Sequence, residues 1–178
     1  MVENEENFKN TVMYQSQADE NFHLFFKIES FLLDIPHFHD SIEMIFMLHG
    51  ETKAHINGKL HTIKEGQICF CAKGQVHYYD NAQKNHKAIC LVLSHGYTHH
   101  FRLQYKDATL PAVMGNIEEN KEIFNLLLNW LDYENKSYLY NCAQINLLFD
   151  MIIKKYGIEK PEKSTKNDNS IKFINYIN

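Results

Sequence analysis

Four side chains suited to metal chemistry lie in the first half of the chain. His37, His39 and Glu43 fall within one short segment, and His77 follows a later, glycine-punctuated stretch. On an extended backbone, side chains alternate between two faces, so His37, His39 and Glu43 all point to one face. Three neutral imidazoles and a carboxylate suit one divalent transition metal, such as Zn, Fe, Ni or Mn, and leave coordination positions for water or a ligand.

Short strands are the elements that must position these side chains. Seven segments between Phe22 and Ser94 are short and rich in Ile, Val, Phe and Tyr, which predicts strands. They are Phe22–Ile28, Glu43–Leu48, Thr52–Ile56, Lys59–Ile63, Gln67–Cys71, Val76–Tyr79 and Ala88–Ser94. The pair Asn57-Gly58 predicts a tight hairpin, because both central residues of a type I′ turn need positive φ. This pattern favours a barrel or a sandwich, and closure into a barrel would bring His77 to the other three ligands.

The hydrophobic periodicity changes after Gly96. Residues 117–133 place large apolar side chains on one broad stripe, and residues 138–156 repeat the pattern before Gly157. Both stretches predict amphipathic helices, antiparallel to each other. A shorter helix is expected around residues 99–105. Residues 159–170 contain almost no apolar side chain and predict an exposed linker.

Composition and charge exclude several classes of protein. The 178 residues are 44% hydrophobic and 22% charged, which is ordinary for one compact globular domain. The net charge of -4 gives no positive field of the kind that binds nucleic-acid phosphates, so contact with DNA needs another part of the protein. No apolar run approaches the ~18 residues of a bilayer span, and no signal-peptide pattern is present, which predicts a cytoplasmic protein without membrane contact.

Two motifs in this chain resemble the two cupin motifs. His37-x-His39-x3-Glu43-x6-Gly50 meets every spacing of the first motif. Gly66-x5-Ala72-x-Gly74-x2-His77-x3-Asn81 resembles the second, and departs from it only at Ala72, where proline is usual. More narrowly, Pro36-His37-Phe38-His39 with Glu43, Leu48-His49-Gly50 and Ile56-Asn57-Gly58-Lys59 resemble the N-terminal effector-binding cupin of AraC-type transcriptional regulators. The resemblance implies a mainly β fold, a double-stranded β-barrel (jelly roll) followed by two antiparallel α-helices.

The AraC-type resemblance also implies a domain organisation. It comprises a flexible N-terminal arm (1–20), the cupin barrel (21–96), a helical dimerisation region (97–158), a linker (159–170) and the truncated start of a helix-turn-helix domain (171–178). Two helices, 117–133 and 138–156, would pair two copies as a homodimer. The implied function is that of a sensor rather than an enzyme. A small molecule, such as a sugar, would bind in the barrel and control DNA binding by the C-terminal domain.

The role of the four candidate ligands has three open readings. His37, His39, Glu43 and His77 could hold a metal, contact an organic ligand without a metal, or make structural hydrogen bonds at the barrel mouth. Tyr79 joins the candidate ligand-binding set because it shares the parity of His77 on an extended strand.

Other side chains are weaker candidates for the site. Aromatic residues could line a pocket or form ordinary core, and two histidines after the last strand could contact a ligand; these are Phe38, Phe46, Tyr78, His99 and His100. Cys69 and Cys71 could supply sulfur ligands, although buried thiols acting as small apolar groups are the simpler reading. The four cysteines form no C-x-x-C pair and are expected to be reduced. The remaining histidines are expected to be solvated.

A function of another class fits the same motifs. A metal-dependent cupin enzyme, such as a dioxygenase or an isomerase, would use His37, His39, Glu43 and His77 as ligands and the metal as a Lewis acid. The helical extension and the absence of an obvious additional acid or base favour the sensor over the enzyme.

Overall fold

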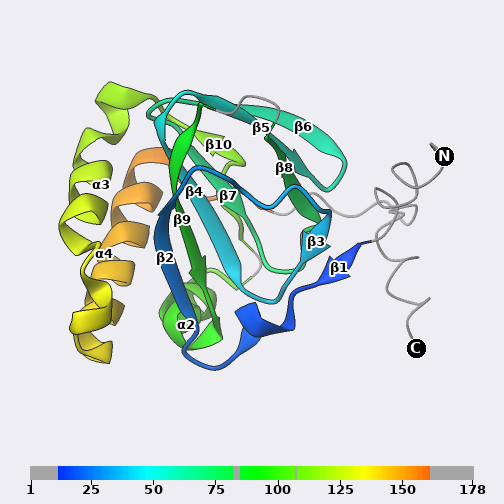
Figure 1. Ribbon diagram of the computed structural model, residues 1–178. Coiled ribbons are helices and arrows are strands. Elements are labelled where there is room, and N and C mark those ends of the chain that lie inside the picture. Colours follow the sequence, from blue (N-terminus) through cyan, green and yellow to red (C-terminus); the bar gives the residue numbers. More distant parts are fainter. Residues whose placement is uncertain (1–11, 82–84, 107, 161–178) are drawn as a thin grey trace, which may run out of the picture.

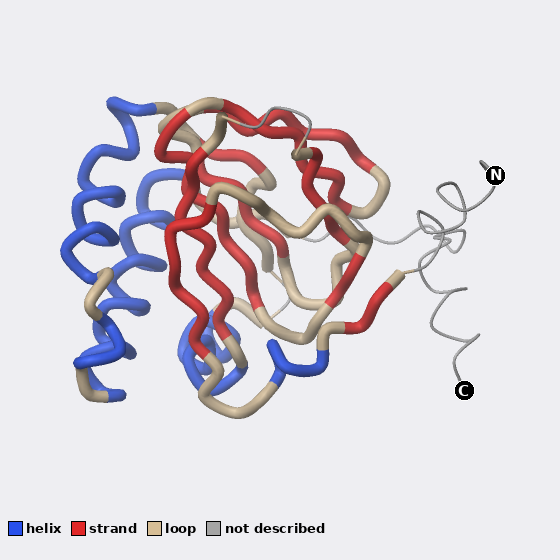
Figure 2. The backbone as a smooth tube through the Cα atoms, viewed as in Figure 1, coloured by secondary structure: helices blue, strands red, loops and turns tan. Residues whose placement is uncertain are grey.

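The computed structural model describes residues 12–81, 85–106 and 108–160, and these build two facing β-sheets with helices against one of them (Figure 1). The strands are β1 (Met13–Tyr14), β2 (Leu24–Glu29), β3 (His37–Phe38), β4 (Ile42–His49), β5 (Glu51–Ile56), β6 (Lys59–Lys64), β7 (Ile68–Cys71), β8 (His77–Asp80), β9 (Lys87–Leu93) and β10 (Val113–Met114). The helices are α2 (His95–Gln104), α3 (Ile117–Trp130) and α4 (Tyr138–Tyr156), with 3₁₀ turns η1 (Ser16–Asp19) and η2 (Tyr133–Asn135). The predicted mainly β fold with helices after the strands is confirmed, as the tube drawing also makes clear (Figure 2).

The chain passes between the two sheets, as it does in a jelly roll. One sheet has the order β1-β3-β8-β5-β6 and the other has the order β10-β7-β4-β9-β2. The predicted hairpin joins β5 to β6, and Asn57 and Gly58 both have positive φ. In the first sheet, β8 lies between β3 and β5, so that His77 is the direct partner of His37 on one side and of Ile56 on the other. This register brings the two cupin-like motifs together.

The second sheet is packed on both faces. In β4, Ile42, Met44 and Phe46 belong to a core shared with the helices, whereas Ile45 and Met47 belong to the core between the two sheets. Strands β7 and β9 divide their side chains in the same way. The sequence of such a strand is an almost continuous run of apolar residues, because neither face of the strand is in contact with water. Glu43 lies on the inner face, which leaves this carboxylate in the barrel.

Helices α3 and α4 run antiparallel over the outer face of the second sheet (Figure 1). The Asn116 side chain accepts hydrogen bonds from the backbone of Glu118 and Glu119, and Ser137 caps α4 in the same way through Tyr140 N. Trp130 is buried against Phe26, with ring centroids 4.6 Å apart, which fixes the end of α3 to the sheet. Among the residues described, no helix combines the length and apolar character needed to cross a bilayer.

The structure differs from the sequence expectations at several element ends. α2 begins at His95 rather than near residue 99, because Ser94 adopts the extended conformation of an N-cap. α3 ends at Trp130 instead of residue 133, and η2 then brings the Tyr133 ring to 5.6 Å from that of Phe26. Strand β10, which pairs with β7, was not expected.

Part of the expected flexible arm is built into the first sheet. Strand β1 pairs in parallel with β3, through Met13 N to Pro36 O at 2.8 Å and Gln15 N to Phe38 O at 3.0 Å. At the other end of the described chain, Glu159 pairs with Thr109, so the expected linker begins in contact with the domain. Residues 1–11, most of the linker and the expected helix-turn-helix start (171–178) lie outside the described residues.

Asn120 connects α3 to three neighbouring elements. Its side chain is fully buried, donates to Gly66 O at 2.8 Å and Met114 O at 3.1 Å, and accepts from the Tyr156 hydroxyl at 2.6 Å. Asn120→Ala leaves these buried groups unpaired, so we expect a loss of about 2–4 kcal/mol in the free energy of unfolding. Urea denaturation measures the loss, with the exposed Asn125→Ala on the same helix as the control. Equal stability of the two variants would contradict this assignment.

Candidate metal centre

Three histidines and one glutamate converge inside the barrel. His37 lies on β3, and His39 is the first residue after that strand. Glu43 lies on β4 in the opposite sheet, and His77 lies on β8. One ligand atom from each of the four lies within 4.8 Å of those from the others. The four residues are at most 5% exposed. The sequence-predicted set is therefore brought together completely, across both sheets.

Backbone carbonyls hold all three imidazoles in one orientation. The Nδ1 atoms of His37 and His77 lie 2.8 Å from Ile35 O and Gln75 O, and that of His39 lies 3.1 Å from Ser41 O. A carbonyl oxygen can only accept, so each Nδ1 carries a hydrogen, and the Nε2 of each imidazole presents its lone pair whenever that imidazole is neutral. An outer partner on Nδ1 is the arrangement that fixes a metal-binding histidine.

The Glu43 carboxylate completes a set of electron-pair donors. Its Oε2 lies 3.3 Å from His39 Nε2 and 3.4 Å from His77 Nε2, and its Oε1 accepts a 2.7 Å hydrogen bond from the Tyr79 hydroxyl. Within the described part of the chain, the buried Nε2 of His77 has no hydrogen-bond partner. Electron pairs that face one another in a buried site need a positive charge between them, which is either a proton on one imidazole or a metal ion. The residues present therefore fit a divalent transition metal, through three Nε2 atoms and one carboxylate.

When no metal is bound, Glu43 carries a negative charge and His77 carries a positive charge. Burial favours neutral Glu43, but the positive charge of His77 and the contact with His39 hold the pKa of Glu43 well below its usual range. Burial disfavours a charged His77, but Cys71 and Glu43 outweigh it and raise the pKa of His77 to about 10. Burial and the nearby His77 lower the pKa of His37 to about 4. At neutral pH, the site thus holds a carboxylate and a protonated His77, while His37 is neutral.

This charge distribution predicts proton release when a metal binds. The pKa of His77, about 10, lies above neutral pH, so its Nε2 carries a proton that a metal must displace. We expect about one proton to be released per metal near pH 7.5, and affinity to rise with pH up to the pKa of His77. Calorimetry in buffers of different ionisation enthalpy counts the protons. Binding without proton release would contradict the assigned charge of His77.

The N-terminal segment contacts the loop that follows His39. The Ser41 hydroxyl donates to Ala18 O of η1, and Ala18 is buried. The neighbouring Asp40 carbonyl accepts a 2.7 Å hydrogen bond from Arg102 of α2. The loop after His39 therefore joins a candidate ligand to both η1 and α2.

The other candidate residues lie in different places. Tyr79 points inward as expected and contacts Glu43. Phe46 packs against Phe124 of α3, outside the barrel, because it has the opposite parity to Glu43 on β4. Tyr78 stacks on His55, with ring centroids 4.3 Å apart, and Phe38 packs beside Tyr14. His99 and His100 are exposed on α2.

The cysteines are free thiols. Cys69 and Cys71 lie in the apolar core between the sheets, which supports their reading as small apolar groups. The Cys71 sulfur also lies 3.7 Å from the Tyr79 hydroxyl. Cys71 on β7 is the cross-strand partner of Glu43 on β4, so knowledge of this strand pairing would have placed the thiol near the centre. We expected His86 to be solvated, but it is buried. Its backbone and that of Asn85 pack closely against Gly50.

Comparisons with known proteins identify the barrel region. Residues 33–94 match the family model described as a cupin domain, which confirms the cupin prediction for this region. No curated protein matches the sequence.

The similar solved structures include both transcription regulators and a predicted enzyme. The AraC-like transcriptional activator CuxR has 12% identity and a TM-score of 0.49, over 77% of this chain and 51% of CuxR. Fatty-acid-bound ToxT from Vibrio cholerae has 12% identity and a TM-score of 0.49, over 89% of this chain and 64% of ToxT. A predicted oxalate decarboxylase from Thermotoga maritima has 26% identity and a TM-score of 0.30, over 35% of this chain and 53% of that protein. The chain thus spans about half the length of CuxR.

Proposed function

We propose that this chain, whose residues 33–94 are a cupin domain, is the ligand-sensing and dimerisation part of an AraC-type transcription regulator. The observation that carries the proposal is the convergence of His37, His39, Glu43 and His77 in the barrel, where the N-terminal strand β1 pairs with β3. The AraC-type pattern of residues around these ligands, and a helical layer on the far face of the second sheet, support the regulator over other cupin proteins.

A divalent transition metal would be held by these four residues. Zn, Fe, Ni and Mn all accept imidazole and carboxylate ligands. When bound, the metal supplies a Lewis-acidic attachment point for an oxygen-bearing small molecule. Tyr79 holds the Glu43 carboxylate in place through its 2.7 Å hydrogen bond, and the three backbone carbonyls hold the imidazoles. The protein's own contribution is thus a rigid, dry receptor for the metal and its ligand.

An effector in the barrel would act through the segments that contact the loop after His39. Coupling requires that the effector binds two protein states with different affinity. Residues 12–20 and α2 both make hydrogen bonds to this loop, so a ligand beside the metal would shift their positions relative to the barrel. The effector is a small oxygen-bearing molecule, such as a sugar.

The helical layer would supply the dimer contact in this cytoplasmic regulator. Leu128 on α3 and Leu139 and Leu147 on α4 are between 45% and 77% exposed, although they are large and apolar. Pairing of α3 and α4 with a second copy would remove these side chains from water. A dimer would then place two C-terminal DNA-binding domains on two half-sites.

DNA binding by the whole protein tests this function. We expect the gene to continue beyond Asn178 into two helix-turn-helix units, and the full-length protein to bind promoter DNA with strong salt dependence. Residues 1–178 alone, with a net charge of -4, should show no salt-sensitive DNA affinity. A stop codon directly after Asn178, or operator binding by residues 1–178, would overturn the proposal.

A metal-dependent cupin enzyme is the second candidate, because the buried four-ligand set is itself sufficient to hold a catalytic metal. Tyr79 and Cys71 are two groups of the chain near the centre. Burial raises the pKa of Tyr79 well above its ordinary value, and the hydrogen bond with Cys69, together with burial, does the same for Cys71. Oxygen uptake by the iron-loaded chain with a panel of small diols and thiols tests this activity. Multiple turnovers per metal would favour the enzyme over the sensor.

A further inference from the structure

Asn57 makes a contact that its place in a hairpin turn does not require. The turn itself needs positive φ, and Asn57 and Gly58 have φ of 48° and 77°. Strands β5 and β8 lie side by side in the first sheet (Figure 1), and Ile56 pairs with His77, so Asn57 lies opposite Val76. Asn57 N donates to Val76 O at 2.8 Å, and Asn57 Oδ1 accepts a hydrogen bond from Val76 N at 3.0 Å. The tip of the hairpin therefore holds both backbone groups of Val76.

The Asn57 side chain replaces one bond of the β-ladder. In an antiparallel sheet, two opposite residues of the hydrogen-bonded type exchange both of their N–H···O=C bonds. For Asn57 and Val76, one of these bonds is made by the backbone, and the other is made by the side-chain oxygen. Glycine would also suit the turn, because it adopts positive φ freely, but it would leave Val76 N without this acceptor. The side chain of Asn57 thus has a task besides the turn.

One peptide group connects Asn57 to the candidate ligand His77. Val76 N and Gln75 O belong to this same peptide group, and Gln75 O lies 2.8 Å from His77 Nδ1. The peptide group is planar and trans, so a bond that fixes the direction of its N–H also fixes the direction of its C=O. Hydrogen bonds in series also polarise and strengthen one another. Asn57 Oδ1 therefore stands at one end of a chain of two hydrogen bonds that ends at the His77 imidazole.

The turn before His77 holds the other end of this peptide group. Gln75 N donates to Ala72 O at 3.2 Å, and Gln75 Oε1 accepts from Ala72 N at 2.8 Å. These bonds fix the Gln75 side of the peptide group, whereas Asn57 fixes the Val76 side. Loss of Asn57 Oδ1 would free the peptide group to rotate, and with it the carbonyl that sets the tilt of the His77 ring.

The tilt of the His77 ring decides where its Nε2 points. The residue is 1% exposed, and its Nε2 lies 3.4 Å from Glu43 Oε2 inside the barrel. A metal bond to an imidazole needs the nitrogen lone pair aimed at the ion, and the partner on the other ring nitrogen sets this aim. A group that holds the Gln75 carbonyl therefore acts on the metal centre.

We propose that Asn57 is a positioning residue of the metal centre, which acts on His77 through the Gln75–Val76 peptide group. Its side-chain oxygen keeps the Gln75 carbonyl directed at His77 Nδ1, and thereby keeps Nε2 directed at the other ligands. Asn57 itself is exposed at the tip of the hairpin. This role rests on the metal centre of the proposed function, and it connects the barrel interior to the surface of the first sheet.

Zinc affinity of two variants at position 57 tests this role, by competition with a chromogenic chelator. Asn57→Gly keeps the positive φ but removes the acceptor, so zinc should bind about three- to tenfold more weakly, the range of one net hydrogen bond. Asn57→Asp should bind zinc within about twofold of the native chain, because aspartate also tolerates positive φ and offers the same acceptor. Native affinity in Asn57→Gly, or an equal loss in both variants, would overturn the proposal.

Hydrogen exchange of the imidazoles in the metal-free protein separates positioning from a general loss of stability. NMR follows the Nδ1 proton of His77, which should exchange with water at least about threefold faster in Asn57→Gly and at the native rate in Asn57→Asp. The Nδ1 protons of His37 and His39 are the control, because Ile35 O and Ser41 O hold them, and their rates should not change.

The exchange rates also keep this role distinct from the proposed function. Faster exchange at all three histidines would show a loosened barrel, and an unchanged rate at His77 would show that Asn57 does not hold it; either result would refute the role of Asn57. A native chain that binds no zinc would refute the metal centre of the proposed function, whereas the exchange rates would still decide whether Asn57 positions His77.

Discussion

Alanine in place of His77 is expected to abolish stoichiometric metal binding. In the native chain, the His77 imidazole is held by Gln75 O, and its Nε2 is buried beside Glu43 without a hydrogen-bond partner among the described residues. Removal of this ligand leaves two histidines and one carboxylate. Loss of an outer partner alone costs about 10- to 100-fold in metal affinity, so loss of a direct ligand should cost more than about a hundredfold.

Elemental analysis of protein purified without chelator measures this effect. We expect about one metal ion per native chain and well under one-tenth of that in His77→Ala. His99→Ala, at an exposed histidine on α2, serves as the control and should keep the full metal content. If His77→Ala does not fold, Glu43→Gln, which keeps the shape of the carboxylate but removes its charge, tests the same site. Native metal content in both variants would exclude this centre.

The metal ligands could be predicted from sequence because their spacing matches two motifs, although the expected single extended segment is not what brings them together. The chain turns between His37 on β3 and Glu43 on β4, so the two side chains face each other from opposite sheets, and pairing of β3 with β8 places His77 opposite His37. Parity on β4 also decides that Phe46 points to the helices, since Glu43 points inward. Most of the candidate centre therefore follows from two motifs and the period of a strand.

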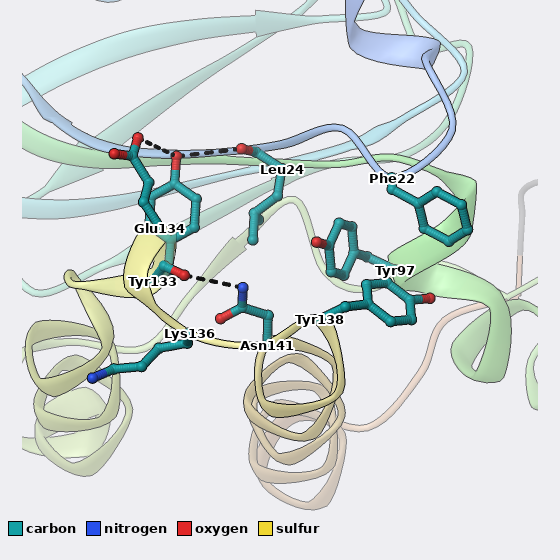
Figure 3. A pocket seen from close by; sticks show the side chains of 8 residues that line it. All are labelled: Phe22, Leu24, Tyr97, Tyr133, Glu134, Lys136, Tyr138 and Asn141. Atoms are coloured by element: carbon teal, nitrogen blue, oxygen red, sulfur yellow. Dashed lines mark hydrogen bonds between the residues drawn. The ribbon is translucent and has the colours of Figure 1, made fainter.

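The contacts that orient the ligands could not be predicted in the same way. Three carbonyl oxygens, from Ile35, Ser41 and Gln75, anchor the imidazoles, and each depends on the path of a loop rather than on its side chains. The pairing of β1 with β3 has no strong sequence signal, because β1 has only two residues and both are exposed. Phe22, Leu24, Tyr97 and Asn141 line one surface pocket (Figure 3), although they come from segments far apart in the sequence that only the tertiary fold brings together.

The second large effect is expected at Gly66, a glycine of the second cupin-like motif. Its φ is +78°, and a Cβ there would lie 2.5 Å from the Cα of Ile117, the first residue of α3. Gly66 O also accepts the hydrogen bond from Asn120, so a shift of this turn would disturb the buried contacts of α3. Left-handed strain costs about 1–2 kcal/mol, and forced displacement of packed backbone costs about 1–3 kcal/mol more. Gly66→Ala should therefore lower the free energy of unfolding by about 2–5 kcal/mol.

Gly74→Ala separates the two causes of this loss. Gly74 has a similar φ of +73°, but a Cβ there would meet no atom within 4 Å, so this variant should lose only the conformational part, about 1–2 kcal/mol. Urea denaturation with a chelator present compares the two variants without any stabilisation from bound metal. Equal losses would show that backbone conformation alone demands glycine at both positions. A larger loss in Gly66→Ala would show that contact with α3 also keeps the position small, and that the motif serves to seat the helical layer on the barrel.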